Sequence, residues 1–250
     1  MKDIFESLLK QLNAGNAAML VSIVENEGSS PREAGANMAV GKGGRLAGTI
    51  GGGNLEFNAE KTAVKDISKQ KTELTEYRLT KEEVAGLGMV CGGDVNVLYT
   101  YLPADEKTKE VLVDIEEQLT AGGSGWLVLG LDGGIGFISE KKGALSDFDM
   151  PEFIDLTQAG DGIIEKDGAK FYIKKIAKKS CVYVFGGGHL AQETVPLLTH
   201  LDFDCVVADD REEYSTKELF PSAKAVYTLN YTDLEGHFDI TENDLLNPYS

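Results

Sequence analysis

The sequence contains few cysteines and few histidines. Cys91, Cys181 and Cys205 are widely spaced and odd in number, and no CxxC pair occurs, so the sequence predicts neither a disulfide framework nor a structural zinc site. Three histidines, none at HExxH or HxxxH spacing, argue against a histidine-built metal site. We expect reduced thiols, and Cys181 and Cys205, which fall in apolar strands, should be inert core residues.

Basic residues and long apolar runs are also scarce. Lys and Arg number 24 against 41 Asp and Glu, a formal charge of −17 that repels phosphate-rich polymers. The densest basic stretch, residues 173–180, lacks interleaved aromatics and falls where we place an interdomain linker. No window approaches the roughly 18 uninterrupted apolar residues of a membrane span, and the N-terminus resembles an amphipathic helix, not a secretion signal. These features argue against nucleic-acid and membrane binding and predict a cytoplasmic protein.

The remaining pattern is that of a two-domain α/β protein, because 250 residues with 42% apolar content can bury two modest cores. We expect a mixed α+β domain over residues 1–178 and a parallel-sheet domain over residues 179–250. Periodicity predicts helices at 3–14, for about 14 residues after 54, at 80–86 and at 109–122. It predicts strands at 17–26, 36–41, 45–50, 72–79, 94–102, 126–131 and 134–140, and a hairpin over 162–175.

The second domain begins with a strand, a glycine turn, a helix and another strand. Gly186, Gly188 and Ala191 fit the G-x-G-x-x-G/A pattern, in which the glycines permit a tight turn and close approach of a phosphate. Asp209 follows the next strand, at the position of a ribose-binding carboxylate. His189 lies inside the turn, where it either contacts a ligand or faces solvent as the first helical residue. The pattern predicts a Rossmann-like fold.

Three glycine-rich loops characterise the first domain, at residues 28–35, 48–56 and 88–94. In the middle loop, Gly51, Gly52 and Gly53 directly precede a predicted helix. Consecutive backbone amides at such a position can form a concave anion site, reinforced by the helix N-terminus. Asn54 is the expected helix cap.

The outer two loops each carry one chemically distinctive side chain. Arg32 can pair bidentately with a phosphate or carboxylate, or it can simply balance Glu33 on the surface. Cys91 precedes two glycines, which would let a ligand reach the sulfur, and a soft thiolate suits a thiophilic metal or a transferred sulfur. The alternative is a small buried residue in a tight turn.

These segments resemble the XdhC/CoxI family, the accessory proteins that mature xanthine dehydrogenase and related molybdenum hydroxylases. The matching stretches are GSSPREAGANMAV (28–40), GTIGGGNLE (48–56), CGG (91–93), FGGGHLA (185–191) and VVADDRE (206–212). The resemblance implies an XdhC/CoxI domain followed by a Rossmann-type domain. It further implies that the protein binds molybdenum cofactor (molybdopterin), holds it while a cysteine desulfurase helps to install the sulfido ligand, and delivers it to the apo-hydroxylase.

Our hypothesis assigns the pterin phosphate to the 51–53 amides and Arg32, and the metal end to Cys91 as molybdenum ligand or sulfur relay. A dinucleotide is expected at the Rossmann-like turn. The candidate binding residues are Ser29, Ser30, Arg32, Gly51, Gly52, Gly53, Asn54, Cys91, Gly92, Gly93, Gly186, Gly188, His189 and Asp209.

Two rival functions and one departure from the family accompany this hypothesis. The rivals are an NAD(P)-dependent oxidoreductase that uses the 186–191 turn, and a scaffold that binds only proteins. Proteins of the family usually continue beyond the ITEND segment, and here the second domain has only about 70 residues, so we expect an incomplete sheet. Its exposed strand edges would favour a homodimer.

Overall fold

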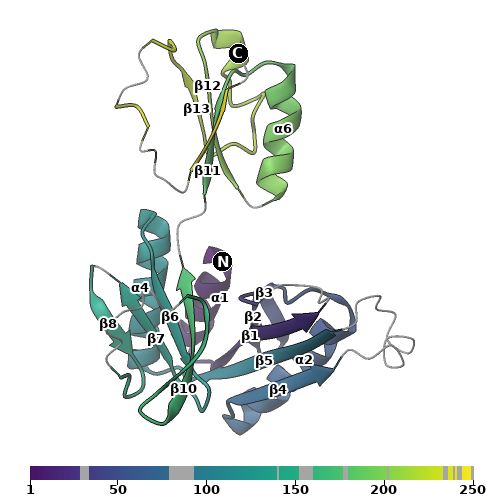
Figure 1. Cartoon of the computed structure of the whole chain (residues 1–250), viewed down its shortest axis with the longest axis vertical. Coiled ribbons are helices and arrows are strands. Elements are labelled where there is room, and N and C mark those ends of the chain that lie inside the picture. Colours follow the sequence, from purple (N-terminus) through teal and green to yellow (C-terminus); the bar gives the residue numbers. More distant parts are fainter. Residues whose placement is uncertain are drawn as a thin grey trace. The chain divides into compact units, whose positions relative to one another are not determined.

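The computed structural model describes residues 1–28, 34–78, 93–139, 141–151, 160–176, 180–201, 203–232, 236–238, 240 and 244–248. The chain forms two compact units, Met1–Ala177 and Lys178–Ser250 (Figure 1). The helix predicted over residues 80–86 lies outside the described residues. No described helix has both the length and the apolar character needed to cross a bilayer.

The first sheet of unit 1 is antiparallel throughout, with the order β3-β2-β1-β5-β4. Helix α2 (Gly53–Lys69) covers one face, because apolar residues recur along it every four positions and become buried. Its partners on the sheet are the alternate apolar residues of the central strands. The strands are β1 (Ala18–Gly28), β2 (Asn37–Gly41), β3 (Gly44–Gly48), β4 (Glu73–Arg78) and β5 (Gly93–Leu102).

The second sheet of unit 1 has the order β8-β7-β6-β10-β9 and is also antiparallel. Apolar residues of α1 (Lys2–Asn13), α4 (Glu106–Ala121) and both sheets share one core. Figure 1 shows the two sheets of this unit with α1 and α4 packed against them. The strands are β6 (Gly125–Gly130), β7 (Ile135–Ser139), β8 (Gly143–Ser146), β9 (Gly162–Lys166) and β10 (Ala169–Ile176).

Two expectations about strand β10 have different outcomes. The hairpin is confirmed, because Asp167 and Gly168 both adopt positive φ (54° and 80°) in the two-residue turn between β9 and β10. The linker placed over residues 173–180 is wrong for its first part, because β10 continues to Ile176. Ile173 and Ile176 are buried in different clusters, on the two faces of β10, so apolar burial outweighs the four lysines nearby.

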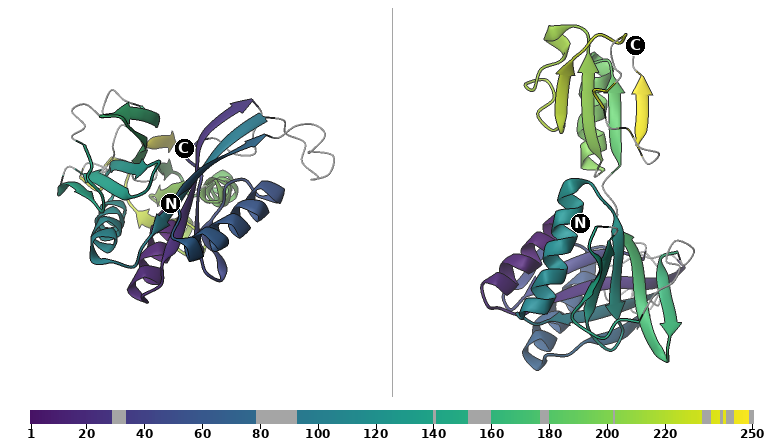
Figure 2. Two further views of the ribbon diagram at one scale, coloured as in Figure 1. Left: turned by 90° about the horizontal axis from the view of Figure 1, so that it is seen from below. Right: turned by 90° about the vertical axis from the view of Figure 1, so that its left-hand side faces the viewer.

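Unit 2 is a four-stranded parallel sheet with the order β13-β12-β11-β14, which matches strands 3-2-1-4 of a Rossmann sheet. Helix α6 (His189–His200) covers one face of this sheet (Figure 2). Cys181 and Cys205 are both buried, which confirms the prediction of core thiols. The remaining elements are β11 (Cys181–Phe185), β12 (Asp204–Asp209), the 3-10 helix η1 (Glu212–Tyr214), β13 (Ala225–Thr228) and β14 (Leu245–Pro248).

Candidate functional site

Two of the three glycine-rich loops of unit 1 are flanked by described residues at the same end of the first sheet. Gly28, the last residue of β1, pairs with Gly93, the first residue of β5 (Figure 1). Arg78, at the end of β4, pairs with Asp94 at this same end. β3 runs towards the same end but stops earlier, because Gly48 pairs with Met38 and Met38 pairs with Val21, so the 49–52 turn follows at the level of Val21.

The predicted residues of the outer two loops lie largely outside the described part of the chain. This applies to Ser29, Ser30, Arg32, Cys91 and Gly92, whereas Gly93 begins β5. The structure therefore leaves the roles of Arg32 and Cys91 as predictions.

Hydrogen bonds close the base of the first loop. Asn26 Oδ1 accepts a hydrogen bond from the amide of Ala34 (3.0 Å), and the Gly35 amide donates to Ile23 O (2.7 Å). The buried Asn37 side chain then donates to Gly35 O (2.9 Å). The described residues on either side of positions 29–33 are therefore fixed against each other by hydrogen bonds.

The three-glycine turn is not an empty anion site, which corrects the expectation for Gly51 and Gly52. Glu56 Oε2, one turn into α2, accepts hydrogen bonds from the amides of Ile50 (3.0 Å) and Gly52 (3.1 Å) and from the Thr49 hydroxyl. The Gly51 amide donates to Thr49 Oγ1 (3.1 Å). The protein thus supplies its own carboxylate to the concave backbone.

Glu56 is held as an anion by these partners. Burial acts to raise its pKa, but the bonds from Thr49, Gly52 and Ile50 and the Arg45 guanidinium together lower the pKa below the ordinary value. Arg45 Nη1 contacts Glu56 Oε1. The signal in the sequence is the GTIGGGNLE segment, in which Glu56 follows the three glycines. Composition alone does not show that this carboxylate bonds to the amides of the turn.

The helix cap predicted at Asn54 is also wrong. The N-cap of α2 is Gly52, with φ 74° and ψ −165°, and Asn54 is the second helical residue. A glycine suits this cap because L side chains rarely adopt that φ. The amides of Gly53 and Asn54 lie in the first turn, where a helix provides no acceptor for them, so they remain the part of the turn that can meet a ligand.

A cavity of about 520 Å³ lies at the same end of the first sheet, and sequence reasoning missed it. Its described lining combines residues of β1, β4 and β5 with residues at the start of β9 and in β10. Glu25 and Asn96 line it together because they are cross-strand partners, although they are 71 residues apart in the chain. The described lining residues are Val24, Glu25, Asn26, Ala34, Glu76, Asp94, Asn96, Asp161, Gly162, Ile163 and Tyr172.

The glycine turn of unit 2 has the predicted form. Gly186 adopts φ 111°, and its amide donates to Ala208 O (2.8 Å), which closes the turn onto β12. Gly188 is the N-cap of α6, and nothing lies within 4 Å of the position that a Cβ would take there. Ala191 is fully buried against the sheet, as a small residue at this position should be. His189 is exposed at the first position of α6, in agreement with the solvent-facing alternative.

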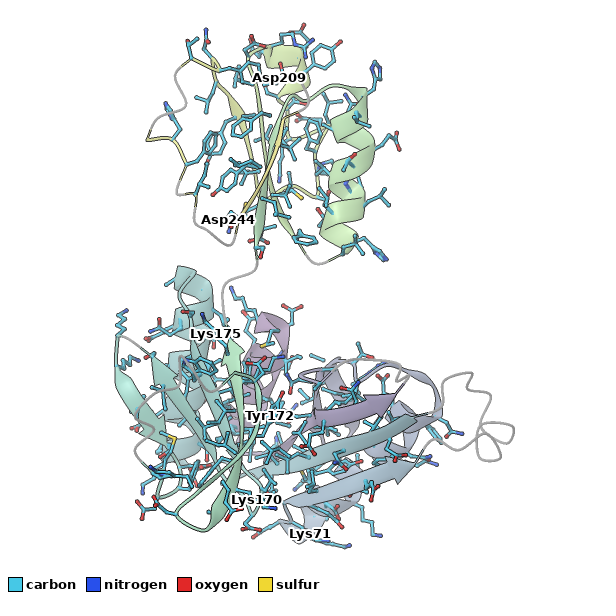
Figure 3. The ribbon with its side chains drawn as sticks, viewed as in Figure 1. Lys71, Lys170, Tyr172, Lys175, Asp209 and Asp244 are labelled. Atoms are coloured by element: carbon cyan, nitrogen blue, oxygen red, sulfur yellow. The ribbon has the colours of Figure 1, made fainter. Side chains whose placement is uncertain are left out.

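Asp209 does not present a free carboxylate to a ribose. It is fully buried at the end of β12 (Figure 3), where Oδ2 accepts from the Gly187 amide (2.7 Å). Arg211 Nε and Nη2 donate to its two oxygens, each at 2.9 Å. The Arg211 hydrogen bonds are the main cause that lowers the pKa of Asp209 to about 2. The Asp209 carboxylate therefore stabilises the glycine turn through hydrogen bonds on its buried side.

Within the described parts of both units, no three His, Cys, Asp or Glu side chains are grouped so that they could hold a metal ion. This observation does not bear on Cys91. The described residues offer hydrogen bonding and charge on the two faces of the first sheet: amides at the N-terminus of α2 on one face, and an acidic cavity on the other.

The fold and these loops define a two-domain protein with an N-terminal α+β domain and a C-terminal Rossmann domain. Comparison with known proteins assigns the class: the model of the XdhC and CoxI family matches residues 11–78, and the model of the XdhC Rossmann domain matches residues 182–243. The chain belongs to the XdhC and CoxI family.

Individual relatives agree with this assignment. The chain is 25% identical over 243 residues to a probable xanthine dehydrogenase subunit of Bacillus subtilis (strain 168), covering 91% of this chain and 70% of that protein. A crystal structure of a Bacillus halodurans protein named a xanthine dehydrogenase has a TM-score of 0.77 and 25% identity, over 99% of this chain and 74% of that one. The uncharacterized protein YqeB of Escherichia coli (strain K12) is 32% identical over 78 residues, 31% of this chain and 14% of that protein. Family and relatives together support a role in xanthine dehydrogenase maturation.

Proposed function

We propose that this protein binds molybdenum cofactor as cargo, holds it during sulfuration, and inserts it into a xanthine dehydrogenase-type apo-hydroxylase. The observation that carries the proposal is the pairing of Gly28 with Gly93. It brings together, at one end of one sheet, the described residues that flank the segments containing Arg32 and Cys91. A ligand with an anionic end and a metal end can therefore meet both loops at once.

The described residues fit the anionic end of such a cargo. The amides of Gly53 and Asn54 point from the start of a 17-residue helix, where the helix dipole favours a phosphate. Glu56 already neutralises the deeper amides, so the phosphate would sit on the outer amides with Arg32 as its counter-ion. Cys91 would face the metal, as a ligand or as the acceptor of sulfur.

The partners follow from the same chemistry. A sulfur donor, of the cysteine desulfurase type, must reach the loop of Cys91, and an apo-hydroxylase must receive the finished cargo. We also propose a homodimer, because Leu245 and Leu246 of β14 are more than half exposed. Light scattering coupled to size-exclusion chromatography tests this last point, and a monomer at micromolar concentration would contradict it.

The test of the proposal is cargo loading in vivo. The tagged protein is purified from a host that makes the cofactor, and bound molybdenum is measured by elemental mass spectrometry alongside oxidised pterin by fluorescence. We expect both in the wild type and a loss of molybdenum in Cys91→Ala. Cys181→Ala is the control, because that thiol is buried in unit 2. Wild-type protein that carries neither pterin nor molybdenum would overturn the proposal.

A further inference from the structure

The cavity at the end of the first sheet has an acidic rim. Glu25 and Asn96 are cross-strand neighbours on β1 and β5, and Glu76 pairs with Asn96 from the other side, so these three residues form one row across the sheet. Asp94 lies two residues before Asn96 on the same face. Asp161, the residue before β9, lines the same cavity.

The rim carries an excess of negative charge. Its four carboxylates belong to exposed side chains, and the described lining contains no lysine or arginine. Lys174 offsets one charge from outside the lining, with its Nζ 3.9 Å from Asp161 Oδ2. Carboxylates are hydrogen-bond acceptors only, so the rim selects a ligand that presents N–H donors and rejects an anionic group.

The floor of the cavity is apolar except for one hydroxyl. Val24 and Tyr172 are almost completely buried there, next to Ile163. The Tyr172 hydroxyl has no hydrogen-bond partner among the described residues. Figure 3 shows Tyr172 on β10, in the second sheet of unit 1. Burial, and then the nearby Asp161 carboxylate, raise the pKa of Tyr172, so the hydroxyl keeps its proton and can donate it.

An unpartnered buried hydroxyl is costly, and a ligand acceptor would remove that cost. The described carboxylates are not grouped as metal ligands, and about 520 Å³ is the size of a small-molecule site. An apolar floor, an acidic rim and one buried hydroxyl together favour a flat ring as ligand, stacked on the apolar floor. Its edge must carry N–H donors for the rim and, beside them, a carbonyl acceptor for Tyr172.

We infer that this acidic cavity receives the 2-amino-4-oxopyrimidine edge of a pterin, with its amino and ring N–H groups directed to the rim and its carbonyl to Tyr172. The inference rests on the proposed function and gives the cargo a contact site other than the helix N-terminus, because the cavity and α2 lie on opposite faces of the first sheet. The same edge occurs in guanine, so the experiment must separate these two sources.

The test uses three probes on the purified full chain by isothermal titration calorimetry at neutral pH. Pterin carries the complete edge, lumazine replaces its 2-amino group by an oxo group, and guanosine carries the edge on a purine. We expect wild type to prefer pterin over lumazine by roughly tenfold or more, because lumazine faces the carboxylates with an acceptor. Guanosine should bind more weakly than pterin.

Variants identify the residues. Glu25→Gln combined with Asp94→Asn should reduce the preference for pterin to less than about threefold, and Tyr172→Phe should weaken both pteridines about three- to tenfold without changing their ratio. Glu6→Gln, an exposed glutamate on α1, is the matched control and should behave as wild type. Thermal unfolding of each variant confirms folding, which the exposed rim positions should not disturb.

The outcomes separate the inference from the proposed function. Equal binding of pterin and lumazine, or variants that bind as wild type does, would overturn the inference even if the protein carries molybdenum in vivo. Stronger binding of guanosine would overturn the pterin assignment. Preferential pterin binding that needs these residues would support the inference even if no cofactor is loaded, and would then count against the proposed function alone.

Discussion

Glu56 Oε2 lies 3.1 Å from the amide nitrogen of Gly52 and accepts its hydrogen bond. The carboxylate thereby occupies the concave backbone that the glycine turn creates, and Arg45 and Thr49 hold it there. A turn filled by the protein's own anion is ordered before any ligand arrives, so the first-turn amides of α2 are already in place.

Replacement of Glu56 by Ala should destabilise unit 1. The amides of Ile50 and Gly52 and the Arg45 guanidinium would lose their shared acceptor, a loss of about 2–3 kcal/mol in the free energy of unfolding. Trp126 in β6, the single tryptophan, reports on unit 1 by fluorescence during urea denaturation. Glu6→Gln should change the free energy by less than about 0.5 kcal/mol. Equal effects of the two variants would show that the Glu56 contacts contribute little.

The stabilisation from Glu56 should depend on pH in a defined direction. Its pKa is lower in the folded than in the unfolded protein, so its contribution is complete above the ordinary value of 4.5 and is lost as the pH falls through the folded pKa. The difference in unfolding free energy between wild type and Glu56→Gln should shrink as pH falls from 6 toward 3. Urea titrations at several pH values, followed by Trp126 fluorescence, measure it. A difference that grows on acidification would contradict the pKa direction.

Alanine substitution at two adjacent glycines of unit 2 should have different effects on the stability of that unit. A Cβ at Gly187 would lie 1.9 Å from Tyr214 O, and backbone cannot yield as a side-chain tip can, so Gly187→Ala should destabilise unit 2 by at least about 1–3 kcal/mol. Gly188→Ala meets nothing within 4 Å and should be tolerated. Hydrogen exchange of the β11 and β12 amides measures the stability of this unit. Similar protection in both variants would argue against the close packing of η1 on the turn.

Asp209 should act as a structural brace and not as a ribose ligand. Asp209→Asn removes the negative charge and one of the two acceptor oxygens that bind the Gly187 amide and Arg211, so exchange protection in β11 and β12 should fall with or without nucleotide. Because Arg211 lowers its pKa to about 2, this stabilisation should persist at pH 4 and be lost as the pH approaches 2. Calorimetric titration with NAD and NADP is the companion measurement. A fully protected Asp209→Asn that loses nucleotide binding would instead favour the oxidoreductase.

The sequence was sufficient for features that depend on local pattern. Apolar spacing in residues 3–14, the Asp167-Gly168 turn and the Gly186-Gly188 turn each predict an element from neighbouring residues, and the structure confirms all three. It was insufficient where a side chain folds back onto backbone, because nothing in the sequence shows that the Glu56 and Asp209 carboxylates accept hydrogen bonds from nearby amides. The cavity could not be predicted either, because Glu25, Asn96 and Tyr172 meet only through strand pairing and sheet packing.

The central position of β1 also determines when the first sheet can form during translation. β1 lies between β2 and β5, and β5 ends at Leu102, more than seventy residues after β1 ends. Until the ribosome has released that later strand, one side of β1 has unpaired backbone groups and an unfinished hydrophobic surface. The nascent chain therefore completes the sheet around β1 only after β5 has been synthesised. A pause in translation between β1 and β5 would leave β1 exposed as an aggregation-prone strand.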